Sequence, residues 1–320
     1  MMEGAMSEFS TPTVESILQD ELLQADDMID SAGPILRHLL ANNDHSMFSD
    51  EIVARVRGMI AHLARQLLHA QGEADGADDP QAYVAARFDV LNETLLANAP
   101  CLNHAHGLAL EWQLAERFEV RNGMDPVLSP LLQALLAARE AAVAETAMAL
   151  LAAQSRFTQQ QRRMELPLGE LPGDLFHAAL LAMRACAEDA DDEAAARAEA
   201  TLRATFDESR SRLGLLSRVI TAMGGGAVAA LSIAHAGVAL FVTALGLGSG
   251  QDRNLVILST NETQMARLAI SLRAAGLKPA VVEQQFAYFH PDIALPDGFD
   301  TLRVDRAAAL LDSAASGQIA

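Results

Sequence analysis

The chain has 320 residues, which exceeds the usual size of a single hydrophobic core, so two helical domains are expected. Hydrophobic residues make up 51% of the sequence and charged residues 20%, a composition that excludes global disorder. The formal net charge of −19 opposes binding to nucleic acid and docking on an anionic membrane.

The composition and the spacing of apolar residues predict an all-α protein. Aromatic residues make up only 4% of the chain, which is rich in the strong helix formers Ala, Leu and Met. Residues 1–10 are expected to be a flexible tail, and a first helix opens at Thr11-Pro12 and ends at Gly33-Pro34. A short helix at residues 35–40 follows. The next helix begins after the N-cap Ser49, and its apolar residues form the clearest amphipathic stripe of the chain: Ile52, Val56, Met59, Ile60, Leu63 and Leu67.

Glycine and proline divide the middle of the chain. Residues 72–79 read as an acidic, glycine-containing linker, and Asp79-Pro80 starts a helix that runs to about Asn98. A further helix covers about residues 102–121. Asp125-Pro126 then starts a long Ala/Leu helix towards Met164.

The main boundary is predicted at residues 165–173, which contain two prolines and two glycines between helix formers. We therefore expect an N-terminal helical bundle over residues 11–164, with the linker 72–79 inside it. A C-terminal helical-repeat domain is expected over residues 174–320.

The C-terminal part repeats a helix–glycine–helix plan three times, at a spacing of roughly 24–28 residues. This rhythm predicts a short α-solenoid-like array of helix-turn-helix units, the alternative being three ordinary helical hairpins in a globular bundle. The expected helix pairs are residues 213–223 with 227–234, residues 238–247 with 253–259, and residues 265–275 with 279–289.

Two stretches of this part are similar to an uncharacterised family of alphaproteobacterial helical-repeat proteins of unknown function. They are HAGVALFVTALGLGSGQ at residues 235–251 and RLAISLRAAGL at residues 267–277. The resemblance covers about the last third of the chain. It implies an all-helical repeat fold and supplies no activity.

Asp26, Asp27 and Asp30 form a DDxxD string on the first predicted helix. One helical turn separates Asp30 from the other two, so the carboxylates share a face and could bridge Mg²⁺ to a diphosphate. The string resembles the aspartate-rich motif of prenyl-diphosphate and terpene synthases, which implies a Mg-dependent all-α enzyme as one alternative. No second acidic motif or arginine pair follows at a suitable distance, so a solvated acidic helix face is the favoured interpretation.

Other chemistry-bearing residues do not assemble into a recognisable centre. His62 and His69 are seven positions apart, so roughly 10 Å of helical rise separates them, which is too far for one ion. His38 and His45 lack the residues that flank a phosphotransfer histidine. The sequence has no GxSxG motif, phosphate-binding loop or dinucleotide fingerprint. Cys101 and Cys186 are expected to be small buried thiols in a reducing cytoplasm. No catalytic, cofactor-binding or metal-binding residue is therefore predicted.

Residues 219–251 carry no formal charge and are long enough to cross a bilayer. Gly224 to Gly226, His235 and Gly237 interrupt the run, so a covered hairpin of the helical array is favoured over membrane association. The combined prediction is a cytoplasmic, non-enzymatic interaction or regulatory scaffold protein that binds a protein partner or a second copy of itself, without nucleic acid.

Overall fold

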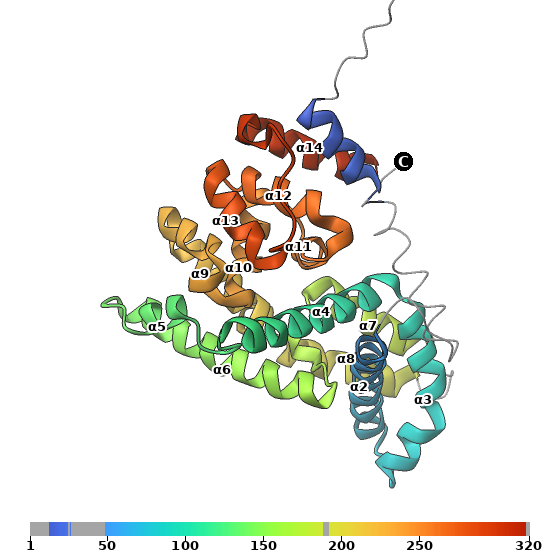
Figure 1. The fold of residues 1–320 in the computed structure, drawn as a ribbon. Coiled ribbons are helices and arrows are strands. Elements are labelled where there is room, and N and C mark those ends of the chain that lie inside the picture. The colour runs from blue at the N-terminus through green and yellow to red at the C-terminus, as the bar shows by residue number, and fades with distance from the viewer. Residues whose placement is uncertain (1–12, 25, 27–48, 188–191, 318–320) are drawn as a thin grey trace, which may run out of the picture. The chain divides into compact units, whose positions relative to one another are not determined.

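The structure is a computed structural model that describes residues 13–24, 26, 49–187 and 192–317 (Figure 1). Within these ranges every regular element is a helix and no strand occurs, so the predicted all-α class is confirmed. The predicted tail at residues 1–10 and the short helix at 35–40 lie outside the described residues.

Residues 14–24 and residue 26 are helical, and we call residues 13–24 and 26 the N-terminal segment. The α-helices that follow are α2 (Asp50–Asp75), α3 (Pro80–Ala97), α4 (Ala99–Asn122), α5 (Pro130–Leu136), α6 (Ala141–Arg163), α7 (Gly173–Ala185), α8 (Asp192–Thr205), α9 (Arg212–Ala222), α10 (Ile233–Ser249), α11 (Arg253–Ser259), α12 (Met265–Ala274), α13 (Pro279–Phe289) and α14 (Val304–Gly317). Short 3-10 helices are η1 (Leu168–Glu170), η3 (Glu208–Arg210), η4 (Gly224–Leu231), η5 (Glu262–Gln264) and η6 (Phe299–Thr301).

The chain divides into two compact units whose limits differ from the predicted domains. The larger unit covers Asp30–Ala244, and the smaller unit combines Met1–Ile29 with Leu245–Ala320. Residues 165–173, the expected boundary, lie inside the larger unit. The N-terminal segment, expected in a bundle at 11–164, belongs to the smaller unit instead.

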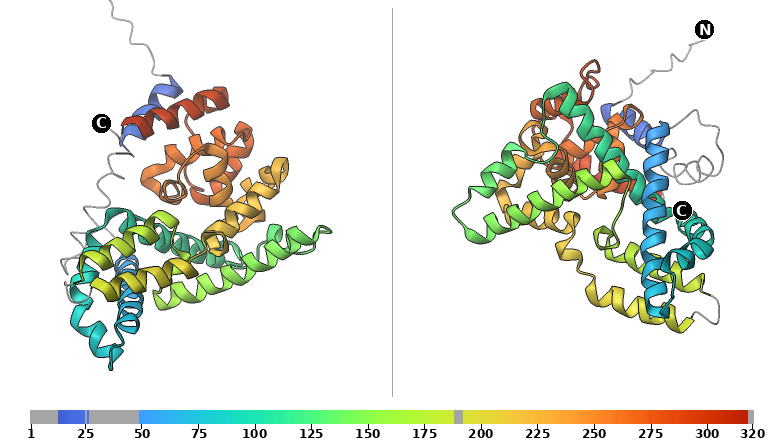
Figure 2. Two further views of the ribbon diagram at one scale, coloured as in Figure 1. Left: turned by 180° about the vertical axis from the view of Figure 1, so that it is seen from behind. Right: turned by 90° about the horizontal axis from the view of Figure 1, so that it is seen from below.

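Helix α2 forms the centre of the larger unit, where it packs against α3, α4, α7 and α8 (Figures 1 and 2). Ser49 caps its first turn by accepting a hydrogen bond from the Ile52 amide at 3.3 Å. All six apolar residues of the predicted stripe are at most 3% exposed. Burial of each such side chain contributes about 1.5–3 kcal/mol, so this face explains why α2 lies where it does.

The first half of the predicted linker at residues 72–79 is helix. Helix α2 continues to Asp75, and Gly76, with φ of 72°, ends it. Gly72 is buried inside the helix, and a Cβ there would lie 3.1 Å from the Tyr83 ring. The glycine that suggested a linker therefore permits the close approach of α3 to α2.

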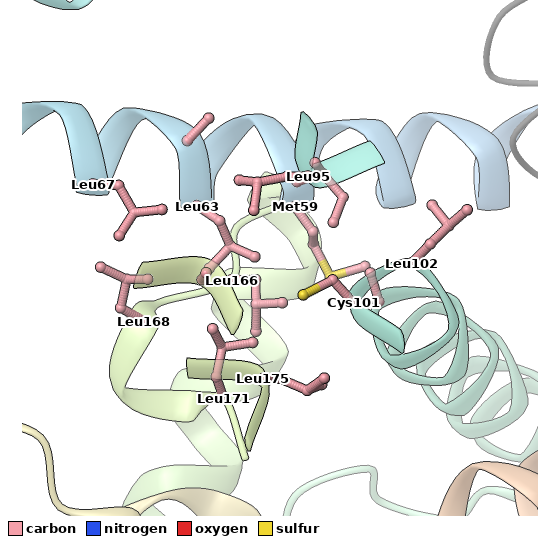
Figure 3. Packing of buried hydrophobic residues seen from close by; sticks show 14 of the residues in the cluster. Met59, Leu63, Leu67, Leu95, Cys101, Leu102, Leu166, Leu168, Leu171 and Leu175 are labelled. Carbon is pink, nitrogen blue, oxygen red and sulfur yellow. The ribbon is translucent and has the colours of Figure 1, made fainter. Parts of the chain in front are cut away.

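Residues 165–173 join α6 to α7 through the hydrophobic core. Leu166, Leu168 and Leu171 are buried there, and Figure 3 shows Leu166 next to Met59 and Leu63 of α2 and Leu168 next to Leu67. Helix α6 ends at Arg163 with Met164 in a left-handed conformation, and the three leucines make the segment that follows, including η1, part of the core. The prolines and glycines of residues 165–173 are typical of a linker, and this composition does not indicate that the leucines among them are buried.

Side chains of α2 satisfy the backbone of this buried segment. The Leu166 amide donates to His62 Nδ1 at 3.1 Å, and the Leu168 amide donates to Gln66 Oε1 at 3.0 Å. Gln66 Nε2 donates in turn to the Leu166 carbonyl at 2.9 Å. Because buried backbone groups need partners, His62 has a structural role here.

Gly58 marks the closest approach of α2 to the end of α6. A Cβ at Gly58 would lie 2.5 Å from Met164 Cβ, and Met164 itself has φ of 57°. We expect Gly58→Ala to lower the free energy of unfolding by about 1–3 kcal/mol, because the two helices would have to move apart. Urea denaturation measures this loss. Gly225→Ala, which meets open space, serves as the matched control and should stay within about 0.5 kcal/mol of wild type.

The long helix predicted from Asp125-Pro126 to Met164 is two helices, α5 and α6. The Asp125 carboxylate accepts from the amides of Val127 and Leu128 at 2.8 and 3.0 Å, which forms a turn and does not start a helix. Ser129 is the cap that starts α5, through a hydrogen bond from the Leu132 amide at 3.2 Å. Asp125-Pro126 and Ser129-Pro130 both combine a capping residue with a proline, and only the second pair starts a helix.

The helix pairs expected in the C-terminal part are present in modified form. Helices α10 and α11, and α12 and α13, correspond closely to the second and third predicted pairs. In the first pair, Gly224 to Gly226 belong to η4 and do not form a separate turn. Gly237, with φ of 70° and ψ of 169°, breaks α10 near its start. Within the smaller unit α12 packs against α11, α13 and α14.

The uncharged stretch at residues 219–251 is distributed over α9, η4 and α10. In the described part of the chain, no single helix has both the length and the apolar character needed to cross a bilayer. The pairs α9 with η4 and α10 with α11 meet those criteria only when each sharply bent pair is counted together.

Candidate functional site

Asp26 is the described member of the DDxxD string, and it is buried at 5% exposure. Its carboxylate forms an ion pair with Arg267 of α12, so it is engaged within the protein. Asp27 and Asp30 lie outside the described residues. Among the residues that the structure describes, no group of three His, Cys, Asp or Glu side chains is arranged to hold a metal ion.

The remaining candidate residues are placed separately. His62 binds the backbone of Leu166, His69 is exposed on α2, and His38 and His45 lie outside the described ranges. Cys101 is buried, and desolvation raises the pKa of its thiol to about 11, which disfavours the reactive thiolate. The Cys186 sulfur lies 3.3 Å from Thr94 Oγ1.

His106 of α4 is 4% exposed, and burial lowers the pKa of its imidazole to about 4 from the usual 6.5. The unfolded chain therefore binds the proton first as the pH falls, so this contribution to stability is complete above pH 6.5 and is lost towards pH 4. We expect His106 to lower the free energy of unfolding by about 2 kcal/mol when the pH falls from 7.5 to 5.0. Urea denaturation at the two pH values measures the loss, which His106→Gln should remove and His69→Gln should retain. Equal pH dependence in wild type and His106→Gln would contradict this assignment.

A buried ion pair in the larger unit joins α4 to α9. Arg212 Nη1 and Nη2 donate to the two carboxylate oxygens of Glu111, each at 2.8 Å, and both side chains are at most 3% exposed. Arg212 Nη1 also donates to Gln154 Oε1 at 3.2 Å, and its guanidinium lies 3.7 Å from the centre of the Phe157 ring. Sequence analysis missed this cluster, because 101 residues separate the two charges and no local pattern links them.

The most distinctive surface lies in the smaller unit, which binds the N-terminal segment against α12, α14 and the turn at Gly298. Figures 1 and 2 show the segment beside α14. Leu18 and Leu22 are each 1% exposed, which accounts for the apolar side of the contact. Arg267 of α12, Arg306 of α14 and Gly298 contact the segment, and we call the surface around these three residues the helix-binding surface.

Polar contacts fix the segment at both of its ends. Arg306 Nη2 of α14 donates to Glu15 Oε2 at 2.9 Å, and this contact lowers the pKa of Glu15. At the other end Arg267 pairs with Asp26, while Arg267 Nη1 donates to Gln251 Oε1 at 2.7 Å. The two ion pairs therefore set the direction in which the helix lies.

The backbone supports this surface. Gly298 has φ of 85°, a left-handed conformation that glycine adopts readily, and a Cβ there would lie 3.8 Å from Val14 Cβ. Arg273 of α12 donates from Nε to the Leu302 carbonyl at 2.6 Å and from Nη1 to the Leu277 carbonyl at 2.8 Å. These bonds hold the chain before α14 against α12.

No model of a known protein family matches the chain, and no curated protein or solved structure matches it either. The resemblance of residues 235–251 and 267–277 to a helical-repeat family therefore stays a prediction. The sequence signal for the helix-binding surface is the spacing of Leu18, Leu22 and Asp26, which places all three on one helix face. Sequence analysis placed that helix with residues 11–164, whereas its described contacts are with the smaller unit.

Proposed function

We propose that this protein is a non-enzymatic interaction protein that binds an α-helix of a protein partner on the helix-binding surface. The observation that supports this most directly is the helix already bound there, which comes from the far end of the chain. Its two leucines are buried and its two ion pairs lie at its ends. Amphipathic helices bind in a groove of a partner protein through contacts of this kind. A surface that holds a helix through buried leucines and ion pairs has the chemistry needed to bind another amphipathic helix.

The proposal includes the short solenoid-like arrangement expected for the C-terminal helix pairs. Its support is the succession of contacts from α11 to α12 and from α12 to α13. It also includes a cytoplasmic location, supported by the free thiols of Cys101 and Cys186. The net charge of −19 favours a protein partner over nucleic acid.

A photo-crosslinking residue at Ala309 tests the proposal, since Ala309 is exposed and lies one helical turn after Arg306 on the same face of α14. We expect a specific and saturable crosslinked partner in the native cytoplasm. An excess of a peptide of residues 13–28 should suppress it, whereas the same peptide with Leu22→Asp should not. The matched control carries the photo-crosslinker at Leu181, an exposed position on α7 of the larger unit. No saturable partner at Ala309, or a partner insensitive to the peptide, would contradict the proposal.

A further inference from the structure

Three buried side chains of the N-terminal segment define what the helix-binding surface recognises. Leu18, Leu22 and Asp26 are four residues apart, so they follow one face of the helix, and each is at most 5% exposed. Asp20, by contrast, is exposed. The surface therefore meets the sequence Leu-x-x-x-Leu-x-x-x-Asp.

Arg267 makes the acidic position different in kind from the two leucines. Its side chain is 2% exposed, and burial lowers the pKa of its guanidinium from the usual value, which reflects the cost of removing this charge from water. Gln251 contributes one neutral acceptor, at 2.7 Å, and the Asp26 carboxylate contributes the compensating charge. Asp26 is the counter-ion of Arg267 among the residues that the structure describes, so a helix without a carboxylate at this position would leave the buried cation without that partner.

Building on the proposed function, we infer that Arg267 is the specificity-determining residue of the helix-binding surface. The partner it fits is an amphipathic helix with two leucines four residues apart and a carboxylate four residues after the second. The N-terminal segment then acts as a built-in competitor that carries the same three residues. A partner helix binds by displacing the segment.

The competitor sets a threshold for the partner. Because the segment belongs to the same chain as its binding surface, it competes at an effective concentration on the order of 1 mM. A partner helix at micromolar concentration therefore needs a correspondingly tighter intrinsic fit. A helix that lacks the carboxylate binds more weakly, because it must displace the segment and also leaves Arg267 without the Asp26 charge.

The test uses the full chain with a site-specific protease sequence inserted between Gly33 and Pro34, in the stretch that joins the segment to α2. Cleavage leaves the segment bound but removes its concentration advantage, so labelled peptides of residues 13–28 can exchange with it. Fluorescence anisotropy measures the binding of three peptides: wild type, Asp26→Asn and the matched control Asp20→Asn. Both variants change the formal charge equally, at a buried position and at an exposed one.

We expect wild-type and Asp20→Asn peptides to bind with similar Kd, and the Asp26→Asn peptide to bind about 100-fold more weakly. Equal binding of the Asp26→Asn peptide would overturn the role of Arg267 while leaving a helix-binding function in place. If cleavage unfolds the smaller unit, as circular dichroism would report, the uncut Leu18→Ala/Leu22→Ala variant replaces it. Absence of binding to either folded protein would overturn the inference.

Discussion

Replacing Glu111 with glutamine is expected to lower the free energy of unfolding by about 3–5 kcal/mol. The change keeps the size of the side chain but removes the charge that balances Arg212, and both groups are at most 3% exposed. Gln154 remains as a neutral acceptor at 3.2 Å, which does not replace the bidentate carboxylate. Urea denaturation at pH 7 followed by circular dichroism measures the loss.

The matched control is Glu119→Gln, an exposed position two turns further along α4, which should change stability by less than about 0.5 kcal/mol. The double variant Glu111→Leu/Arg212→Met separates the cost of a lone charge from the value of the pair. We expect it to recover stability to within about 1 kcal/mol of wild type, because apolar replacements of buried ion pairs are often neutral. A single variant that loses less than about 1 kcal/mol would show that Arg212 finds another counter-ion.

Asp26→Asn in the full chain is the second change with a large expected effect, again about 3–5 kcal/mol. The loss should fall on the N-terminal segment, since detachment lets water reach the Arg267 guanidinium without unfolding the larger unit. Hydrogen exchange of residues 13–24 is therefore the measurement, and we expect it to become at least about 100-fold faster.

Exchange in α2 provides the internal reference, because it lies in the larger unit and should be unaffected. Asp20→Asn is the matched variant and should leave exchange of the segment unchanged, as expected for an exposed carboxylate. Equal protection of residues 13–24 in wild type and Asp26→Asn would show that the two leucines alone hold the segment.

Local chemistry made many helix ends predictable from the sequence. Ser49 and Asp79 cap α2 and α3, as predicted, through side-chain hydrogen bonds to amides two or three residues on. Asn98 caps α4 in the same way, although the predicted start of that helix was about residue 102. The apolar stripe of α2 is buried as its period of 3.6 residues predicts. These features depend on neighbours within one or two turns, which a single sequence displays.

Long-range features could not be predicted in the same way. The 165–173 segment has the composition of a linker. It is part of the core because Leu166, Leu168 and Leu171 are buried in the same cluster as the apolar residues of α2. The pairing of Arg267 with Asp26 depends on a fold that brings the two ends of the chain together. Because a charge carries no mark of its partner, the sequence could suggest Asp26 as a metal ligand but could not show its counter-ion.

The helix-binding surface is synthesised long after the N-terminal segment that it binds. Arg306 is synthesised 291 residues after the Glu15 that it binds. At about 5–20 residues per second, this interval is roughly 15–60 s. During that time Leu18 and Leu22 have no completed surface to bury them, while the larger unit is already emerging. The smaller unit therefore cannot complete its fold until the residues of α14 have been made.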